Sequence, residues 1–356
     1  MGHKIIVTGG CGFIGHHFIE HLIKNTDWNI IIFDKLTYAS NGYDRLRDIN
    51  VFDDKRIKIF NVDLVTGISD GVKQEVGRDV NYIVHMAAET HVDRSIEDPI
   101  PFVMSNVVGT MRMLEYAKYL NKVHSEIVTK ADEFKCYGSA KPSLLEQFVY
   151  FSTDEVFGPA PRGKFYKEWD RYDSTNPYSA SKAGGEELCL AYANTYKIPM
   201  LISHTMNVFG ERQHPEKFIP KVIKCVLTGE TLTIHANSTR TKAGSRCWIH
   251  ARTVADALLF MLGGGPIKRD KINIVGPEMD NLELAKFIAK VIGKPLKYEM
   301  VDFHSSRPGH DLRYALDGNK LRGLGFKPQY NLKDSLRKTV EWLLSRPEWL
   351  GISNGE

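Results

Sequence analysis

Short apolar runs rich in β-branched and aromatic residues alternate with helix-like segments through the first part of the chain. The candidate strands are residues 5–7, 30–33, 57–61, 82–85, 148–151 and 200–203. The main candidate helices are residues 13–24, 101–120 and 177–196. Fully apolar strands that alternate with helices are typical of a parallel sheet covered on both faces. The chain is therefore predicted to be an α/β protein with a doubly wound, Rossmann-type sheet.

The remainder of the chain is less regular and predicts a smaller region of mixed α/β structure. Glycine and proline punctuate it repeatedly, and a closing helix is expected at 332–344. At about 150 residues per domain, 356 residues suit two domains. We place the first at 1–204 and the second at 205–356, with segments of about 246–275 returning to the first. A polar stretch at about 121–146 reads as an insertion between a helix and the next strand.

Composition excludes several classes of protein. The net charge of +4 is too small and too dispersed to favour a nucleic-acid partner. The five cysteines are odd in number and form no C-x-x-C pair, so neither a disulfide framework nor a metal site is expected. No signal peptide or membrane-length apolar run is visible, which predicts a cytoplasmic protein with no membrane partner.

A glycine pattern follows the first candidate strand and opens the first candidate helix. Gly9 permits a tight turn, Gly12 lets a pyrophosphate approach the backbone, and Gly15 lets the helix pack close to the sheet. Phe13 and Ile14 begin a helix whose free N–H groups and positive dipole end would face the phosphates. The pattern predicts a dinucleotide site.

An acid ends the second candidate strand, at the distance from the glycines that such a site requires. Asp34 lies about 20 residues past the glycine turn, where a carboxylate binds the adenosine ribose hydroxyls. Because it would repel a 2′-phosphate, NAD is favoured over NADP. Asp63 and Leu64, after the third strand, are candidates for holding the adenine, although Asp63 is nearly as well explained as a loop aspartate.

A tyrosine and a lysine supply a candidate catalytic pair. Tyr178 and Lys182 are spaced i,i+4 on a helix that begins at Pro177, so they share one face. A nearby lysine cation stabilises phenolate and lowers the pKa of a tyrosine. Tyr178 would then remove a proton from a sugar hydroxyl. Thr153, at the end of the strand at 148–151, would hold the reacting oxygen.

The motifs Thr8-Gly9-x-x-Gly12-Phe13-x-Gly15 and Tyr178-x-x-x-Lys182 resemble those of the extended short-chain dehydrogenase/reductase superfamily. The resemblance covers most of the chain. Several longer segments are similar to the dTDP-glucose 4,6-dehydratase branch, namely residues 34–39, 85–95, 152–156, 215–220 and 307–314.

The resemblance implies a lyase (hydro-lyase) of deoxysugar biosynthesis that oxidises C4 of a nucleotide-linked glucose, eliminates water across C5 and C6, and returns hydride to C6. NAD would stay tightly bound and be regenerated in each cycle. Glu155 would act as base at C5 and Asp154 as acid towards the C6 oxygen. An epimerase needs no such pair, so Asp154 and Glu155 discriminate between the two activities. The resemblance also implies a homodimer formed through paired helices, expected at 101–120 and 177–196.

A sugar nucleotide carries a diphosphate, which calls for cations and other polar groups. Within the matching segments and the loops after the sixth strand, the candidates are Thr90, Asn207, Lys217, Arg246, Arg307 and His310.

Departures from the family pattern leave the nucleotide base open among dTDP, UDP, GDP and CDP. Phe157 stands where such dehydratases usually carry tyrosine, and residues 235–244 are longer and more basic than the family's compact turn. The alternatives are a nucleotide-sugar 4-epimerase, a UDP-glucuronate decarboxylase, and a non-enzymatic NAD- or RNA-binding relative. The last predicts a broken Tyr/Lys pair or a marked basic face, and neither is seen.

Overall fold

The structure, a computed structural model, describes residues 2–133, 145–265, 269–303 and 312–352, without the side chains of 122–133. Its chain divides into two compact units that each gather several segments. The first unit comprises Met1–Ser152, Pro177–Ser203 and Leu258–Ile272. The second comprises Thr153–Asn176, His204–Ala257 and Asn273–Glu356. Within the described ranges, no helix combines the length and apolar character needed to cross a membrane.

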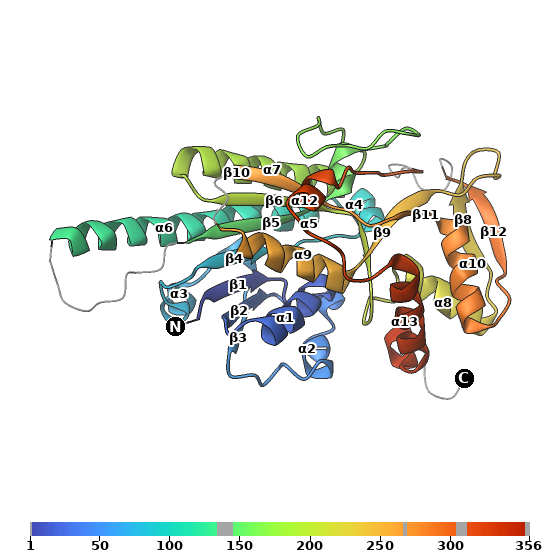
Figure 1. Ribbon diagram of the computed structural model, residues 1–356, viewed down its shortest axis with the longest axis horizontal. Helices are drawn as coiled ribbons and strands as arrows, with labels where there is room; N and C mark the ends of the chain where they lie inside the picture. Colours follow the sequence, from blue (N-terminus) through green and yellow to red (C-terminus); the bar gives the residue numbers. More distant parts are fainter. Residues whose placement is uncertain (1, 134–144, 266–268, 304–311, 353–356) are drawn as a thin grey trace. The chain divides into compact units, whose positions relative to one another are not determined.

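A seven-stranded sheet forms the centre of the first unit (Figure 1). Its strands are β1 (Lys4–Thr8), β2 (Asn29–Asp34), β3 (Ile57–Asn61), β4 (Tyr82–His85), β5 (Gln147–Thr153), β6 (Met200–Thr205) and β10 (Arg269–Ile274). They lie in the order β3-β2-β1-β4-β5-β6-β10, and the pairs from β3 to β5 are parallel. The order reverses between β1 and β4, as in dinucleotide-binding folds. The predicted Rossmann-type α/β fold is confirmed.

Helices cover both faces of this sheet. They are α1 (Phe13–Asn25), α2 (Asp44–Asp48), α3 (Asp70–Val76), α4 (Val92–Glu97), α5 (Ile100–Val103), α6 (Thr110–Glu133) and α7 (Pro177–Tyr196). Apolar side chains of α6 and α7 join alternate sheet residues such as Ile6, Ile83 and Phe148 in one core. The intervening sheet residues face the other way, towards α1, whose Phe18 and Leu22 are fully buried. Short 3₁₀ turns occur at Tyr38–Ser40 (η1) and Leu64–Thr66 (η2).

The helix expected at 101–120 differs from the prediction at both ends and in the middle. α5 passes into a π-helical turn, η3 (Met104–Gly109), and α6 then continues to Glu133. The first half of the predicted insertion at 121–146 is therefore helix. The apolar period stops near Leu120, but no glycine or proline interrupts the chain before Gly138, so the backbone has no reason to leave the helix. Residues 134–144 lie outside the described residues.

The second unit is built from small sheets and helices around its own core. A three-stranded sheet has the order β11 (Glu278–Asp280), β9 (Ser245–His250), β7 (Asn207–Phe209), and β8 (Leu232–Ala236) pairs in parallel with β12 (Tyr298–Asp302). The helices of this part are α8 (Phe218–Thr228), α10 (Asn281–Ile292), α12 (Asn319–Gly323), α13 (Leu332–Leu344) and η5 (Pro347–Leu350), and α9 (Ala251–Gly263) runs on into the first unit. Apolar side chains of α8, α10 and α13 pack in one cluster. The predicted closing helix is confirmed at the same residues.

Candidate active site

The glycine turn that joins β1 to α1 leaves no space for a side chain at two of its glycines. Gly9 has a φ of +71°, and a Cβ on Gly15 would lie 2.2 Å from the Gly9 carbonyl oxygen. Only glycine fits at these two positions. A Cβ on Gly12, just before Phe13 and Ile14 open α1, would meet only the Gly9 oxygen at 3.1 Å. The exposed side of the turn is thus the side where Gly12 stands, as a backbone cradle for phosphate requires.

Asp34 ends β2 beside this turn, because Thr8 and Phe33 are paired in the sheet. Its carboxylate accepts hydrogen bonds from the backbone N–H groups of Cys11 (3.0 Å) and Leu36 (2.8 Å). Burial raises the pKa of Asp34, while these two bonds and the Arg45 cation oppose the rise. The acid is therefore placed at the turn by hydrogen bonds that leave lone pairs for a ribose.

Arg45 belongs to this corner and was missed by sequence reasoning. The residue is 1% exposed, and Nη1 donates to the carbonyl oxygens of Ala39 (2.7 Å) and Ser40 (2.6 Å). Asp63 has a local partner as well: its Oδ1 accepts from the Val65 N–H at 2.9 Å and caps η2, where Leu64 is buried. The adenine role of Asp63 and Leu64 remains a prediction.

A chain of hydrogen bonds fixes the strand ends behind the turn. The Thr8 hydroxyl oxygen accepts from the backbone N–H groups of Met86 and Ala87, so its own proton points to His85 Nδ1 at 2.7 Å. His85 Nε2 then donates to Thr110 Oγ1 at 3.0 Å. Both ring nitrogens are occupied in the neutral form, and burial lowers the pKa of His85 to about 3. His85 is thus a neutral link between β1, β4 and α6.

Tyr178 and Lys182 lie on the buried face of α7, as their spacing predicted. Tyr178 is 8% exposed and packs against Phe102, with the ring centroids 6.4 Å apart. Lys182 Nζ donates to the Phe151 carbonyl oxygen at 2.7 Å and stands 4.2 Å from the centroid of the Tyr150 ring. Burial lowers the pKa of Lys182 to about 8, and the charge of Glu186 works against that decrease. Lys182 therefore remains a cation at neutral pH.

Glu186, one turn further along α7, is a second residue that sequence reasoning missed. Its carboxylate is fully buried, accepts a hydrogen bond from Ser152 and pairs with Lys271 at 3.4 Å. Gly185, between the two charged residues, allows the helix to touch β5. A Cβ there would lie 2.3 Å from Tyr150 Oη and 2.8 Å from the Asn106 carbonyl oxygen. The i,i+4 spacing of Lys182 and Glu186 was a visible signal for this arrangement.

In the second unit, Thr153 leads from β5 into a 3₁₀ turn, η4 (Asp154–Phe157). Thr153 Oγ1 accepts from the Glu155 N–H at 3.3 Å and donates to Asp154 Oδ1 at 3.1 Å. Asp154 is 5% exposed, whereas Glu155 is half-buried and its Oε2 accepts from Asn176 at 3.2 Å. Burial raises the pKa of Asp154 to about 7, helped by the charge of Glu155 and opposed by that of Arg246. The turn thus pairs a readily protonated acid with a second carboxyl group.

The structure describes four of the six candidate residues for binding the nucleotide end of a substrate. Arg246 Nη1 donates to the carbonyl oxygens of Ser245 (2.8 Å) and Leu312 (2.9 Å), and its guanidinium lies over the Tyr314 ring. Asn207 begins β7, Lys217 precedes α8, and Thr90 is exposed in the first unit after β4. Arg307 and His310 lie outside the described residues.

The departures at Phe157 and at residues 235–244 have different structural consequences. Phe157 is fully buried and packs against Tyr166, Tyr172 and His204 with ring centroids 4.8–5.5 Å apart, so the missing hydroxyl leaves a filled aromatic cluster. The stretch at 235–244 begins in β8 and continues as an exposed turn in which Asn237 Oδ1 accepts from the N–H groups at 241 and 242.

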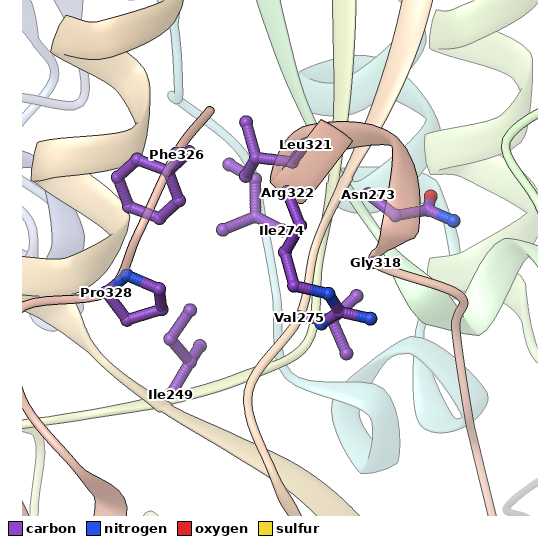
Figure 2. Close-up of a pocket in the computed structure, with 9 residues that line it drawn as sticks. All are labelled: Ile249, Asn273, Ile274, Val275, Gly318, Leu321, Arg322, Phe326 and Pro328. Carbon is purple, nitrogen blue, oxygen red and sulfur yellow. The ribbon is translucent and has the colours of Figure 1, made fainter. Parts of the chain in front are cut away.

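A small hollow in the second unit contains none of the predicted site residues (Figure 2). Ile249, Ile274, Leu321 and Phe326 line it together with the polar Asn273 and Arg322. The Asn273 amide at its edge already donates to the carbonyl oxygens of Tyr166 and Asp317. We therefore assign it to packing.

Comparison with known proteins gives consistent matches over nearly the whole chain. Residues 5–275 match the model of the NAD dependent epimerase/dehydratase family. A dTDP-glucose 4,6-dehydratase of Escherichia coli is 35% identical, with 98% of this chain and 94% of the relative covered. The low-salt glycan biosynthesis protein Agl12 of Haloferax volcanii is 36% identical, with 97% and 99% covered.

A solved structure agrees with these matches. It is the crystal structure of DesIV (dTDP-glucose 4,6-dehydratase) from Streptomyces venezuelae with NAD and TYD bound. It superposes with a TM-score of 0.81 at 32% identity, covering 97% of this chain and 98% of that one.

Proposed function

Because the chain belongs to the NAD dependent epimerase/dehydratase family, we propose that it is a 4,6-dehydratase of a nucleoside diphosphate glucose, with dTDP-glucose as the first candidate. Relatives of that name match almost its full length. The observation that carries the choice of reaction is Asp154, a buried carboxyl group with a pKa of about 7 next to Glu155. A dehydratase needs an acid and a base there, whereas an epimerase needs neither.

The residues around the glycine turn fit the family's cofactor. Gly12 leaves the turn open where a Cβ would otherwise stand, and the Asp34 carboxylate is held at the end of the neighbouring strand. When bound, NAD supplies the acceptor for the hydrogen removed at C4 and its donor at C6. Gly9, Gly12, Phe13, Ile14 and Gly15 would hold the pyrophosphate, and Asp34 the ribose.

Tyr178 would accept the proton of the C4 hydroxyl. The ammonium group of Lys182, fixed by the Phe151 carbonyl, would stabilise the resulting phenolate. Thr153, which gives its hydroxyl proton to Asp154 Oδ1, would turn that proton to the C4 oxygen and hold it as a hydrogen-bond donor.

Asp154 and Glu155 would carry out the elimination. The ketone at C4 acidifies C5–H, and Glu155 would take that proton while Asp154 gives its proton to the departing C6 oxygen, which leaves as water. Glu155 would then return its proton to C5. Over one cycle Asp154 loses a proton and Tyr178 gains one. Both groups are restored when Tyr178 releases a proton to solvent and Asp154 takes one up.

The substrate's nucleoside diphosphate would be held by polar groups outside this machinery. We propose Arg246 as its main described cation, together with Thr90, Asn207 and Lys217, and with Arg307 and His310. Arg246 has a fixed orientation because two backbone carbonyls hold one of its nitrogens.

The test is incubation of the NAD-loaded protein with dTDP-, UDP-, GDP- and CDP-glucose. A 4-keto-6-deoxy sugar, detected by its absorbance in alkali and by mass, is expected from one of them and should be absent with Tyr178→Phe. Formation of a nucleoside diphosphate galactose instead would show an epimerase. No 4-keto product from any of the four would refute the proposal.

We also propose a homodimer in the cytoplasm. Apolar side chains are exposed along α4, α5 and η3, including Ile100 (65%), Val103 (44%) and Met104 (39%), as expected of a surface that pairs with a second copy. The four described cysteines are free thiols, which suits a reducing compartment. Light scattering of the wild type and of Ile100→Asp tests the dimer, which the charge should weaken. Cell fractionation tests the location.

A further inference from the structure

The ion pair of Glu186 and Lys271 continues the buried face of α7 that carries Tyr178 and Lys182. Both side chains are buried, at 0% and 3% exposure, and Glu186 also accepts the Ser152 hydroxyl hydrogen bond. An ion pair without access to water is expensive to bury, and replacing such a pair by apolar residues is often neutral for stability. Stability alone therefore gives no reason for these charges to be here.

The position of Glu186 suggests what the charges of Glu186 and Lys271 do. It stands one helical turn from Lys182, and its other contact, Ser152, immediately precedes Thr153. We propose that Glu186 is a positioning residue that fixes the end of β5 through Ser152 and keeps the ammonium group of Lys182 charged. Lys271 holds the Glu186 carboxylate in place and balances its charge. The inference rests on the proposed roles of Tyr178 and Lys182.

The surroundings leave few other groups that could set the charge of Lys182. The titratable groups that face it from the neighbouring elements are His85 on β4, Tyr150 on β5, and Tyr178 and Cys189 on α7. Burial keeps His85 neutral and raises the pKa of both Tyr150 and Cys189. Glu186 is thus the anionic group whose charge offsets the burial of Lys182, among the groups described around it.

The experiment titrates Tyr178 directly in the NAD-bound protein, without a sugar nucleotide. Tyrosinate absorbance is followed against pH, and the signal of Tyr178→Phe is subtracted. Without Glu186, Lys182 should lose its proton more readily and Tyr178 should lose its nearest counter-charge, so Glu186→Gln should raise the midpoint by about one pH unit. Lys271→Met removes the cation that balances Glu186, which favours the charge on Lys182, and should move the midpoint down. The double variant should fall between them.

Two controls separate this role from a structural one. Glu187→Gln changes the exposed neighbour on the same helix and should titrate like the wild type. Glu186→Asp keeps the charge and should restore most of the midpoint. A general loosening of the fold would not move the two single variants in opposite directions. If Glu186→Gln does not fold, the direction of the shift in Lys271→Met decides.

An unchanged midpoint in folded Glu186→Gln, or shifts of the same sign in both single variants, would overturn the inference. Because no substrate is present, opposite shifts without any dehydration of a sugar nucleotide would contradict only the proposed function. Normal dehydration with unmoved midpoints would contradict only the role of Glu186.

Discussion

Neighbouring groups oppose the effect of burial on α7 in the first unit and reinforce it on η4 in the second. Lys182 and Asp154 are almost equally hidden, at 3% and 5% exposure. Lys182 has a carbonyl, an aromatic face and the charge of Glu186, so its pKa stays at about 8. Asp154 has the like charge of Glu155 beside it, and its Oδ2 meets no hydrogen-bond partner among the described residues, so its pKa rises to about 7. Near neutral pH, Lys182 on α7 therefore stays charged, whereas Asp154 on η4 retains a proton.

The sharpest way to break this comparison is to remove the cation. Lys182→Met should lower kcat by about 10³-fold or more. Without the cation, phenolate at Tyr178 loses its counter-charge, and Tyr178 no longer accepts the proton of the sugar hydroxyl. The rate of 4-keto product formation measures this. The thermal unfolding midpoint should change little or increase, since a buried charge is removed. A large decrease in that midpoint would mean that the lost rate reflects unfolding and not the missing charge.

Glu155→Gln should come next, with a loss of about 10²- to 10³-fold in product formation. The change removes the base at C5 and leaves the groups for C4 oxidation untouched. Reduced cofactor should therefore accumulate, and exchange of the C5 hydrogen with deuterated solvent should stop. Turnover at the normal rate would show that Glu155 is not the base.

Asp154→Asn should separate activity from stability. Folding raises the pKa of Asp154 from 3.8 to about 7, so the folded state holds a proton that the unfolded chain has released between those values. Stability contributed by this group is present below pH 3.8 and is lost as the pH rises through about 7.

Asparagine imitates the protonated acid, so above pH 7 the variant should be more stable, by at most about 4 kcal/mol at 1.36 kcal/mol for each pKa unit. Denaturant unfolding at several pH values measures the gain, which should vanish in acid. Activity should fall by about 10²-fold, and its decline above pH 7 should disappear. Equal stability of both proteins at pH 8 would contradict the account.

Arg246→Gln should have the smallest effect, a rise in KM of about tenfold with kcat nearly unchanged, because one charge-assisted contact to a diphosphate is lost. Arg337→Gln, on the exposed face of α13, is the matched control. Steady-state kinetics with the preferred sugar nucleotide checks both. A loss confined to kcat would place Arg246 in the chemistry instead.

The sequence predicted the parts that depend on local pattern. The first six strands, α1, α7 and α13 follow from apolar runs and periodicity, and Gly9, Gly12, Gly15 and Asp34 follow from fixed spacing. The π-helical turn at Met104–Gly109 has no such signature in the sequence. The long α6 was missed because helix formers without an apolar stripe look like a loop.

Residues that act through distant partners were beyond local pattern. Glu186 meets Ser152 and Lys271, which stand 34 and 85 residues away in the chain. Arg45 supports carbonyls that no motif marks. Asp154 and Glu155 could be named from resemblance, but the raised pKa of Asp154 depends on burial that only the fold reveals.

The contact at Gly185 has a consequence for how this chain can evolve. The close approach of α7 to β5 depends on the missing Cβ of Gly185, since a methyl group at that position would overlap Tyr150 Oη. A substitution at Gly185 would therefore push α7 away from β5 and shift Lys182 and Glu186 together. A saturation library should find position 185 closed to the other nineteen amino acids, even beside Tyr150→Phe, because the Asn106 carbonyl oxygen would still lie 2.8 Å from the new Cβ.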